Sequence, residues 1–148
     1  MGTAITRQAD YAARVVLDLS MQPPGAWTTT REIAERRLIP GQLVRQVIAQ
    51  LVRAGLLRSR RGNEGGVSLA RSPADISLLD VVQAMEGSLL LNLCVEDPQE
   101  CPLSQECPVR KVWVRAQEAL EDFLRHETFD LLAQRATETQ EPDYQEGP

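Results

Sequence analysis

The stretch TTTREIAERRLIPGQLVRQVIAQLVRAGL, residues 28–56, decides the fold. Thr29 and Glu32 have the spacing of a capping box, so a short helix is expected to start next to Thr29. This helix should stop by Leu38, because the proline two residues later disfavours helical backbone at the residue before it. After the Pro-Gly turn a second helix is expected over 41–54, followed by a glycine suited to its end. The pattern predicts a helix-turn-helix unit.

The chain after the second helix changes to the period of short strands. Residues 56–70 read LLRSRRGNEGGVSLA, and the positions of Leu57, Val67 and Leu69 suit two strands. The three glycines between these strands suit a tight hairpin loop. A helix-turn-helix followed by a two-stranded hairpin is the winged-helix arrangement.

Helical patterns flank this unit on both sides. Residues 9–20, ADYAARVVLDLS, place apolar side chains on one helical face, and another short helix is expected over 77–86 with Ser77 as its cap. From Pro108 a long helix of roughly 25 residues is expected, about 35–40 Å in length. Its apolar stripe consists of Val109, Val112, Trp113, Ala116, Leu120, Phe123 and Leu124. A small domain cannot cover such a helix with its own surface, so the stripe predicts a homodimer.

Charge is divided between the two halves of the chain. The 148 residues have a formal net charge of -5, but residues 1–72 carry +6 and residues 73–148 carry -11. Opposite signs suggest two functions, and the basic half is the candidate for nucleic acid. No apolar run approaches the roughly 20 residues of a membrane span. The N-terminus has no signal-peptide core either, so a cytoplasmic protein without membrane contact is expected.

The basic half offers side chains that can recognise double-stranded DNA. Arginine and glutamine make paired hydrogen bonds to base edges in the major groove, and arginine suits a narrow minor groove. A helix N-terminus can also hold a phosphate. The alternatives are a solvated charged surface and a winged helix that binds protein. The predicted DNA-binding residues are Thr29, Thr30, Gln42, Arg45, Gln46, Arg60 and Arg61, with Arg53 as a further candidate.

All three cysteines lie within one acidic, turn-rich segment, with the spacing Cys94-x6-Cys101-x5-Cys107. Their odd number argues against a disulfide framework, and the spacing differs from the Cys-x2-Cys pairs of zinc sites. Wide gaps suit a loop that wraps an iron–sulfur cluster, and thiolates are soft ligands. Zinc, a thiol redox switch and three inert cysteines are the alternatives.

An enzyme is not expected. The sequence has no Gly-rich phosphate loop, HExxH motif, nucleophile elbow or paired catalytic histidine. The single histidine, His126, is expected to lie exposed on the long helix.

From Thr6 to about Ala133 the chain resembles the family of winged-helix iron–sulfur regulators that includes IscR, NsrR and RirA. The matching pieces are ADYAARVVLDLS, TTTREIAERRLIP, the run 43–87 and the segments C…CPL…CPVRKVW. The most specific part is the Gly-Leu-Leu to Gly-Gly stretch followed by Ile-x3-Asp-Val-Val from Ile76. The resemblance implies a homodimeric transcription regulator, expected to be a repressor, at a palindromic operator. It also implies control by a 2Fe–2S or 4Fe–4S cluster that senses nitric oxide, redox state or iron.

The same resemblance bears on the cluster ligands. In IscR-like members a histidine lies three residues after the last cysteine, but Arg110 stands there in this chain. In NsrR-like members an aspartate of the partner subunit's first helix is the ligand, and Asp10 matches it. The implied ligands are the three cysteines and Asp10, which places the chain closer to NsrR and RirA. The alternative for Asp10 is an ion pair with Arg14. The alternative function is a cluster-free regulator of the same fold, controlled by thiol oxidation or a protein partner.

The predicted fold class is mainly α, with a winged helix-turn-helix domain, a small β-hairpin wing and a long C-terminal dimerisation helix. The predicted parts are the DNA-binding domain 1–87, the cysteine loop 88–107, the dimerisation helix 108–136 and a disordered tail 137–148.

Overall fold

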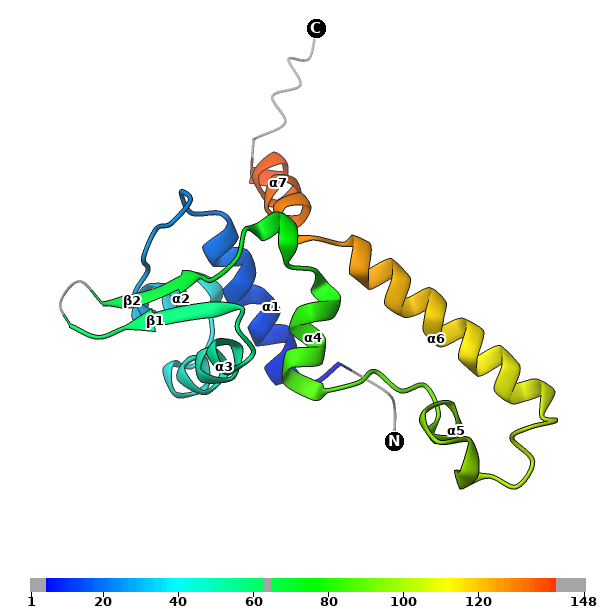
Figure 1. Ribbon diagram of the computed structural model, residues 1–148. Helices are drawn as coiled ribbons and strands as arrows, with labels where there is room; N and C mark the ends of the chain where they lie inside the picture. The colour runs from blue at the N-terminus through cyan, green and yellow to red at the C-terminus, as the bar shows by residue number, and fades with distance from the viewer. Residues whose placement is uncertain (1–4, 63–64, 141–148) are drawn as a thin grey trace, which may run out of the picture.

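The computed structural model describes residues 5–62 and 65–140 and is mainly helical (Figure 1). The helices are α1 (Arg7–Ser20), α2 (Thr30–Arg37), α3 (Gly41–Arg53), α4 (Leu78–Glu86), α5 (Leu93–Glu96), α6 (Pro108–His126) and α7 (Phe129–Gln140). The strands are β1 (Leu57–Arg60) and β2 (Gly66–Leu69). Figure 1 shows α1–α4, α7 and the hairpin gathered into one body, from which α6 and the α5 loop extend on the side opposite the hairpin. The predicted fold class is confirmed.

The core lies where α1 meets α3, α4 and the hairpin. Helix α1 runs through the centre of the body and contacts α2, α3, α4, α7 and β2. Its apolar face is fully buried, as the helical spacing of the sequence predicts. The largest apolar side chains with almost no exposure are Phe129, Ile33, Leu51, Leu57, Ile76, Val15, Val16, Val44, Val47, Val67 and Val81.

The helix-turn-helix has the predicted boundaries because local side-chain chemistry sets them. The Thr29 hydroxyl accepts a hydrogen bond from the Glu32 N–H at 3.2 Å, and the Thr29 N–H donates to the Glu32 carboxylate at 2.9 Å. This pair forms the predicted capping box. Helix α2 ends at Arg37, and the next residue, Leu38, adopts a left-handed conformation with φ 53°. Gly55, with φ 76°, follows the end of α3.

The wing is a two-stranded hairpin with a third segment attached to it. Strands β1 and β2 pair antiparallel, and Thr28 pairs with Val67 through backbone hydrogen bonds of 2.9 and 2.8 Å. Gly66 has φ 136°, and a Cβ atom there would lie 2.4 Å from the Thr28 carbonyl oxygen. Only glycine fits this position, so the wing packs directly against the chain that enters α2.

The C-terminal region differs from the prediction. The single helix expected over 108–136 is two helices, because α6 ends at His126 and α7 starts at Phe129. The Phe129 side chain is 1% exposed and its N–H donates to the Ile76 carbonyl at 2.9 Å. Burial of this ring in the core brings the chain back to the main body. No glycine or proline stands between α6 and α7, so no local signal in the sequence marks this break.

The predicted disorder was wrong for residues 137–140, which belong to α7, and residues 141–148 lie outside the described part of the chain.

Candidate nucleic-acid interface and cysteine loop

Helix α3 presents a polar face to solvent. Its opposite face is buried through Val44, Val47, Ile48 and Leu51. The exposed face contains the predicted residues Gln42, Arg45 and Gln46, with Arg53 further along the helix. The spacing i, i+3, i+4 places the first three side by side, as a helix that reads a DNA groove requires.

The N-terminus of α2 and the wing meet at a shallow depression of about 310 Å³. Thr29, Thr30 and Arg60 all line this depression, so the structure brings three of the predicted residues together. The Thr29 hydroxyl is already engaged, because it donates to the Glu32 carboxylate at 3.0 Å. These hydrogen bonds, first from the Thr29 N–H and then from its hydroxyl, hold the pKa of Glu32 below its ordinary value. A phosphate at this helix end would therefore compete with the Glu32 carboxylate for the N–H and hydroxyl of Thr29.

The wing carries an arginine–tryptophan stack that sequence reasoning missed. Arg60 and Arg61 are exposed, as predicted. The Arg60 guanidinium carbon lies 4.1 Å from the centre of the Trp27 ring, and that of Arg58 lies 5.7 Å from it. Trp27 stands beside a basic hairpin in space only because Thr28 joins the sheet, and no local pattern predicts that pairing.

A buried carboxylate connects α1 to α2. Asp18 has no solvent exposure and accepts hydrogen bonds from Arg36 at 2.8 and 3.1 Å and from Arg37 at 2.9 Å. The hydrogen bond to Asp18 raises the pKa of Arg36. Two arginines of the basic half are thus paired with a buried carboxylate, although the Arg36 side chain is still 42% exposed. The sequence contains one signal for this ion pair that was not used: Asp18 is an acidic residue on the apolar face of α1.

Asp10 makes the ion pair that was the alternative to cluster ligation. Its carboxylate lies 2.7 Å from an Arg14 guanidinium nitrogen, and Arg14 also donates to the Arg37 carbonyl at 3.4 Å. Asp10 lines an open groove of about 1120 Å³ between α1, α4 and α6, together with Leu120 and Leu124. The Asp10 carboxylate is therefore held by another residue of α1, and not by the cysteine loop.

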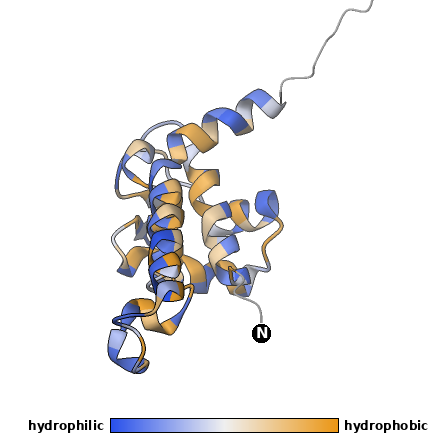
Figure 2. Cartoon of the chain, turned by 90° about the vertical axis from the view of Figure 1, so that its right-hand side faces the viewer, coloured by the Kyte–Doolittle hydropathy of each residue, from blue (hydrophilic) through white to orange (hydrophobic). Residues whose placement is uncertain are grey.

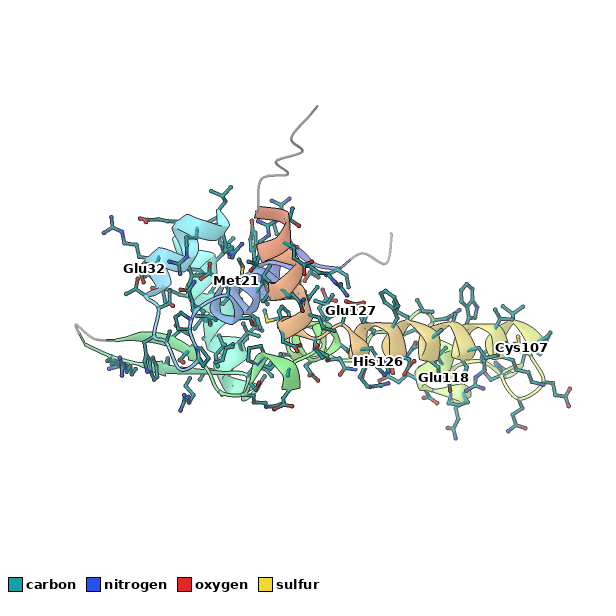
Figure 3. The ribbon with its side chains drawn as sticks, turned by 90° about the horizontal axis from the view of Figure 1, so that it is seen from above. Met21, Glu32, Cys107, Glu118, His126 and Glu127 are labelled. Carbon is teal, nitrogen blue, oxygen red and sulfur yellow. The ribbon has the colours of Figure 1, made fainter. Side chains whose placement is uncertain are left out.

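The three cysteines are free, half-buried thiols. Cys94 lies in α5, Cys101 follows a single helical turn, and Cys107 immediately precedes α6. Arg110, which stands where IscR-like members have a histidine, donates to the Cys94 carbonyl at 2.8 Å. This hydrogen bond connects the cysteine loop to α6. Figure 3 shows Cys107 and His126 at opposite ends of α6, with Cys107 at the end distant from α2. His126 is exposed, as predicted.

The loop fits an iron–sulfur cluster in its donor chemistry. Three thiols supply soft ligands, and the Ser104 hydroxyl between the second and third cysteines is buried without a hydrogen-bond partner. Such a hydroxyl suits donation to a sulfur atom. In the conformation described for residues 5–62 and 65–140, no three His, Cys, Asp or Glu side chains converge as a metal site. Cluster binding would therefore require the loop to close and Asp10 to come from elsewhere.

Residues 5–135 match the family Rrf2, described as an iron-dependent transcriptional regulator. The chain is 33% identical to the transcriptional regulator NsrR of Geobacillus kaustophilus over 138 residues, 90% of this chain and 92% of that protein. Alignments with named relatives cover 53% to 92% of each relative's own length. NsrR of Geobacillus kaustophilus and a relative from Synechocystis are both named as transcriptional regulators, which agrees with the expectation that the chain is not an enzyme.

Two solved structures have the same architecture. CymR of B. subtilis, the global cysteine regulator, superposes with a TM-score of 0.75 at 26% identity, over 89% of this chain and 97% of that one. IscR of T. potens superposes with a TM-score of 0.72 at 29% identity, over 93% of this chain and 90% of that one.

None of the helices described for this chain has the length and apolar character that a bilayer crossing needs. The winged helix-turn-helix, the long α6 and the match over residues 5–135 lead to one conclusion. The chain belongs to the Rrf2 family of transcriptional regulators and has its DNA-binding fold.

Proposed function

We propose that the chain is a homodimeric repressor that binds palindromic double-stranded DNA, with an affinity controlled by an iron–sulfur cluster. The observation that carries this proposal is the cysteine loop. Three free thiols lie within residues 94–107, and the last of them directly precedes α6. A rearrangement of the loop therefore acts on the start of α6, which runs back to the DNA-binding body.

The DNA contact is assigned to α3 and the wing. Gln42, Arg45 and Gln46 share the exposed face of α3, and Arg60 and Arg61 extend the basic surface along the hairpin. A two-fold dimer would present two such surfaces to two half-sites, which is the geometry that a palindromic operator matches.

The dimer contact is assigned to α6. Most of its apolar stripe is left exposed by the described residues: Val112 is 60% exposed and Phe123 is 65% exposed. Figure 2 views the molecule from the α6 side and shows hydrophobic and hydrophilic residues mixed along this outer helix. An exposed apolar stripe continuous with an open groove is typical of a protein–protein contact. A second α6 is its natural partner, since the two stripes would be identical.

The residues that would hold the cluster are Cys94, Cys101, Cys107 and Asp10 of the partner subunit. When bound, the cluster supplies a centre whose state depends on nitric oxide, redox conditions or iron supply. Asp10 can serve this role only by leaving Arg14, with which it is paired at 2.7 Å. Arg14 also contacts the last turn of α2 through the Arg37 carbonyl. Recruitment of Asp10 would thus alter a contact between α1 and the helix-turn-helix, which gives the two states different DNA affinities.

A cluster-free regulator of the same fold is the second candidate. The observation that favours it is that the three thiols are free and do not converge on a metal site in the described residues. The likeness to the global cysteine regulator CymR also supports this candidate. In that case oxidation of the thiols, or a protein partner, would control DNA binding.

The deciding experiment is anaerobic purification followed by visible absorbance and by iron and sulfide analysis. The unsubstituted chain is expected to be coloured, and Cys101→Ala is expected to lose the chromophore. Gln105→Ala is the matched control in the same loop. Asp10→Ala should shorten the lifetime of the chromophore or change its spectrum. DNA affinity, measured before and after addition of nitric oxide, should differ.

Two outcomes would overturn the cluster assignment. One is a colourless protein without iron or sulfide after anaerobic purification, which would favour the cluster-free candidate. The other is a full chromophore in Cys101→Ala. An unchanged spectrum and lifetime in Asp10→Ala would leave the thiols as ligands but remove Asp10.

A further inference from the structure

The wing carries an ordered cationic surface on one face of its sheet. Arg58 and Arg60 are two residues apart on β1, so their side chains leave the strand on the same face. Both are exposed. Trp27 reaches this face from the third segment, because Thr28 pairs with Val67 on the far side of β2.

Contact with the Trp27 ring restrains the positions of the Arg58 and Arg60 guanidinium groups. The Arg60 guanidinium carbon is 4.1 Å from the Trp27 ring centre, the distance of a direct stack, and the Arg58 guanidinium is 5.7 Å from the same centre. An exposed arginine otherwise samples many rotamers, and binding must pay for that freedom. Stacking on a ring that the sheet holds in place reduces this loss before any ligand arrives.

Stacking on the Trp27 ring does not use the hydrogen-bonding edge of the Arg60 guanidinium. A ring covers the face of a guanidinium, whereas its N–H groups point outward in the plane and can donate to phosphate oxygens. No carboxylate within residues 5–62 and 65–140 forms a salt bridge with Arg58 or Arg60. Arg60 also borders the depression next to Thr30, so this surface is continuous with the interface assigned to α3 and the wing.

We propose that Trp27 is a positioning residue of the DNA interface, which holds Arg58 and Arg60 against the phosphate backbone of the duplex beside the wing. This inference rests on the proposed DNA contact of the wing and adds two residues to it. Trp27 acts through the arginines and does not itself contact a base. Phosphate contacts of this kind set the orientation of a protein on DNA and do not depend on base sequence.

The test measures binding to a labelled mixed-sequence duplex by fluorescence anisotropy over a range of salt concentrations. Arg58→Ala and Arg60→Ala are each expected to reduce the slope of log Kd against log salt by about one, as loss of one phosphate contact requires. Trp27→Ala is expected to weaken binding about three- to tenfold, whereas Trp27→Phe, which keeps a ring, should largely restore it. Arg125→Ala, an exposed arginine on α6, is the control and should bind as the unsubstituted chain does.

A double-mutant cycle separates positioning from a general structural effect. In a chain that already carries Arg58→Ala and Arg60→Ala, the further change Trp27→Ala is expected to have no additional effect. An equal loss of affinity in both backgrounds would overturn the proposal, as would unchanged salt slopes in the arginine variants. If the unsubstituted chain binds no duplex at all, the proposed function itself fails, which is a different result.

A fluorescence measurement gives an independent readout. The chain has two tryptophans, so Trp113→Phe leaves Trp27 as the only tryptophan emitter. Because Trp113 belongs to the stripe assigned to the dimer contact, this variant is first required to match the unsubstituted chain in sedimentation and in duplex affinity. Its emission is expected to change on addition of duplex, and the change should disappear when Arg58 and Arg60 are both alanine. Emission that is insensitive to duplex while anisotropy reports binding would contradict the placement of Trp27 at the interface.

Discussion

Asp18 shows how one residue can alter the interpretation of a charge pattern. The basic half of the chain has 11 arginines, yet Arg36 and Arg37 are bound to this buried carboxylate. Their charges stabilise the contact between α1 and α2 and are partly neutralised by Asp18 before the protein meets DNA. A count of basic residues therefore overstates the surface that DNA meets.

The cap of α2 gives a prediction about pH. The Thr29 N–H, and after it the Thr29 hydroxyl, hold the pKa of Glu32 below its ordinary value of 4.5. Because the folded pKa is the lower one, the ionised carboxylate stabilises the protein above about pH 4.5, and this contribution is lost as pH falls through the folded pKa. Glu32→Gln is expected to lower Tm at neutral pH, and the difference from the unsubstituted chain should vanish in acid.

Thermal unfolding followed by circular dichroism at several pH values checks this expectation. Glu35→Gln is the matched control, because it removes the same charge from the same helix without touching the cap. A difference in Tm that stays constant across the whole pH range would mean that the ionised cap contributes nothing.

At the scale of the element, α7 depends on a single aromatic anchor. Phe129 is 1% exposed in the core, and a large-to-small change at such a site typically costs about 3–5 kcal/mol. Phe129→Ala is expected to reduce the free energy of unfolding by an amount in this range and to loosen α7 from α1. Denaturant unfolding measures the loss.

The control for this change lies on the same helix. Leu131 is 40% exposed, so Leu131→Ala should cost much less than Phe129→Ala. Similar costs for the two substitutions would show that α7 is not held by burial of Phe129.

The elements that could be predicted are those with local causes. The capping box of α2, the end of this helix shortly before Pro40 and the proline that starts α6 are local effects within a few residues. Helix α7 and the Trp27 stack could not be predicted in this way. The long helix is interrupted because Phe129 packs in the core next to Ile76. Ile76 lies more than 50 residues away in sequence, so no local pattern reveals this contact. The exposed face of α3 was predicted because its periodicity is local.

At the scale of the whole molecule, the apolar stripe of α6 predicts the state of association. Phe123→Glu places a charge in the stripe at a position that is 65% exposed in the single chain. The unsubstituted chain is expected to sediment as a dimer and Phe123→Glu as a monomer, because burial of an unpaired carboxylate is costly. Analytical ultracentrifugation distinguishes the two.

Glu118 supplies the control on the opposite face of α6. Glu118→Lys changes the charge by more than Phe123→Glu does, yet the protein should stay dimeric. A dimer that persists in Phe123→Glu, or a monomer in the unsubstituted chain, would contradict the assignment of α6 as the dimer contact.

The separation of the wing from the cysteine loop has a kinetic consequence. The basic residues of the helix-turn-helix and the wing lie at one end of the molecule, whereas the cysteine loop 88–107, at the far end of α6, has four acidic residues and no basic one (Figure 1). The molecule is therefore an electric dipole. As it diffuses toward a duplex, the phosphate field turns the wing forward and repels the acidic end. Encounters then begin in the orientation that binding requires, and their frequency falls as added ions shorten the reach of that field.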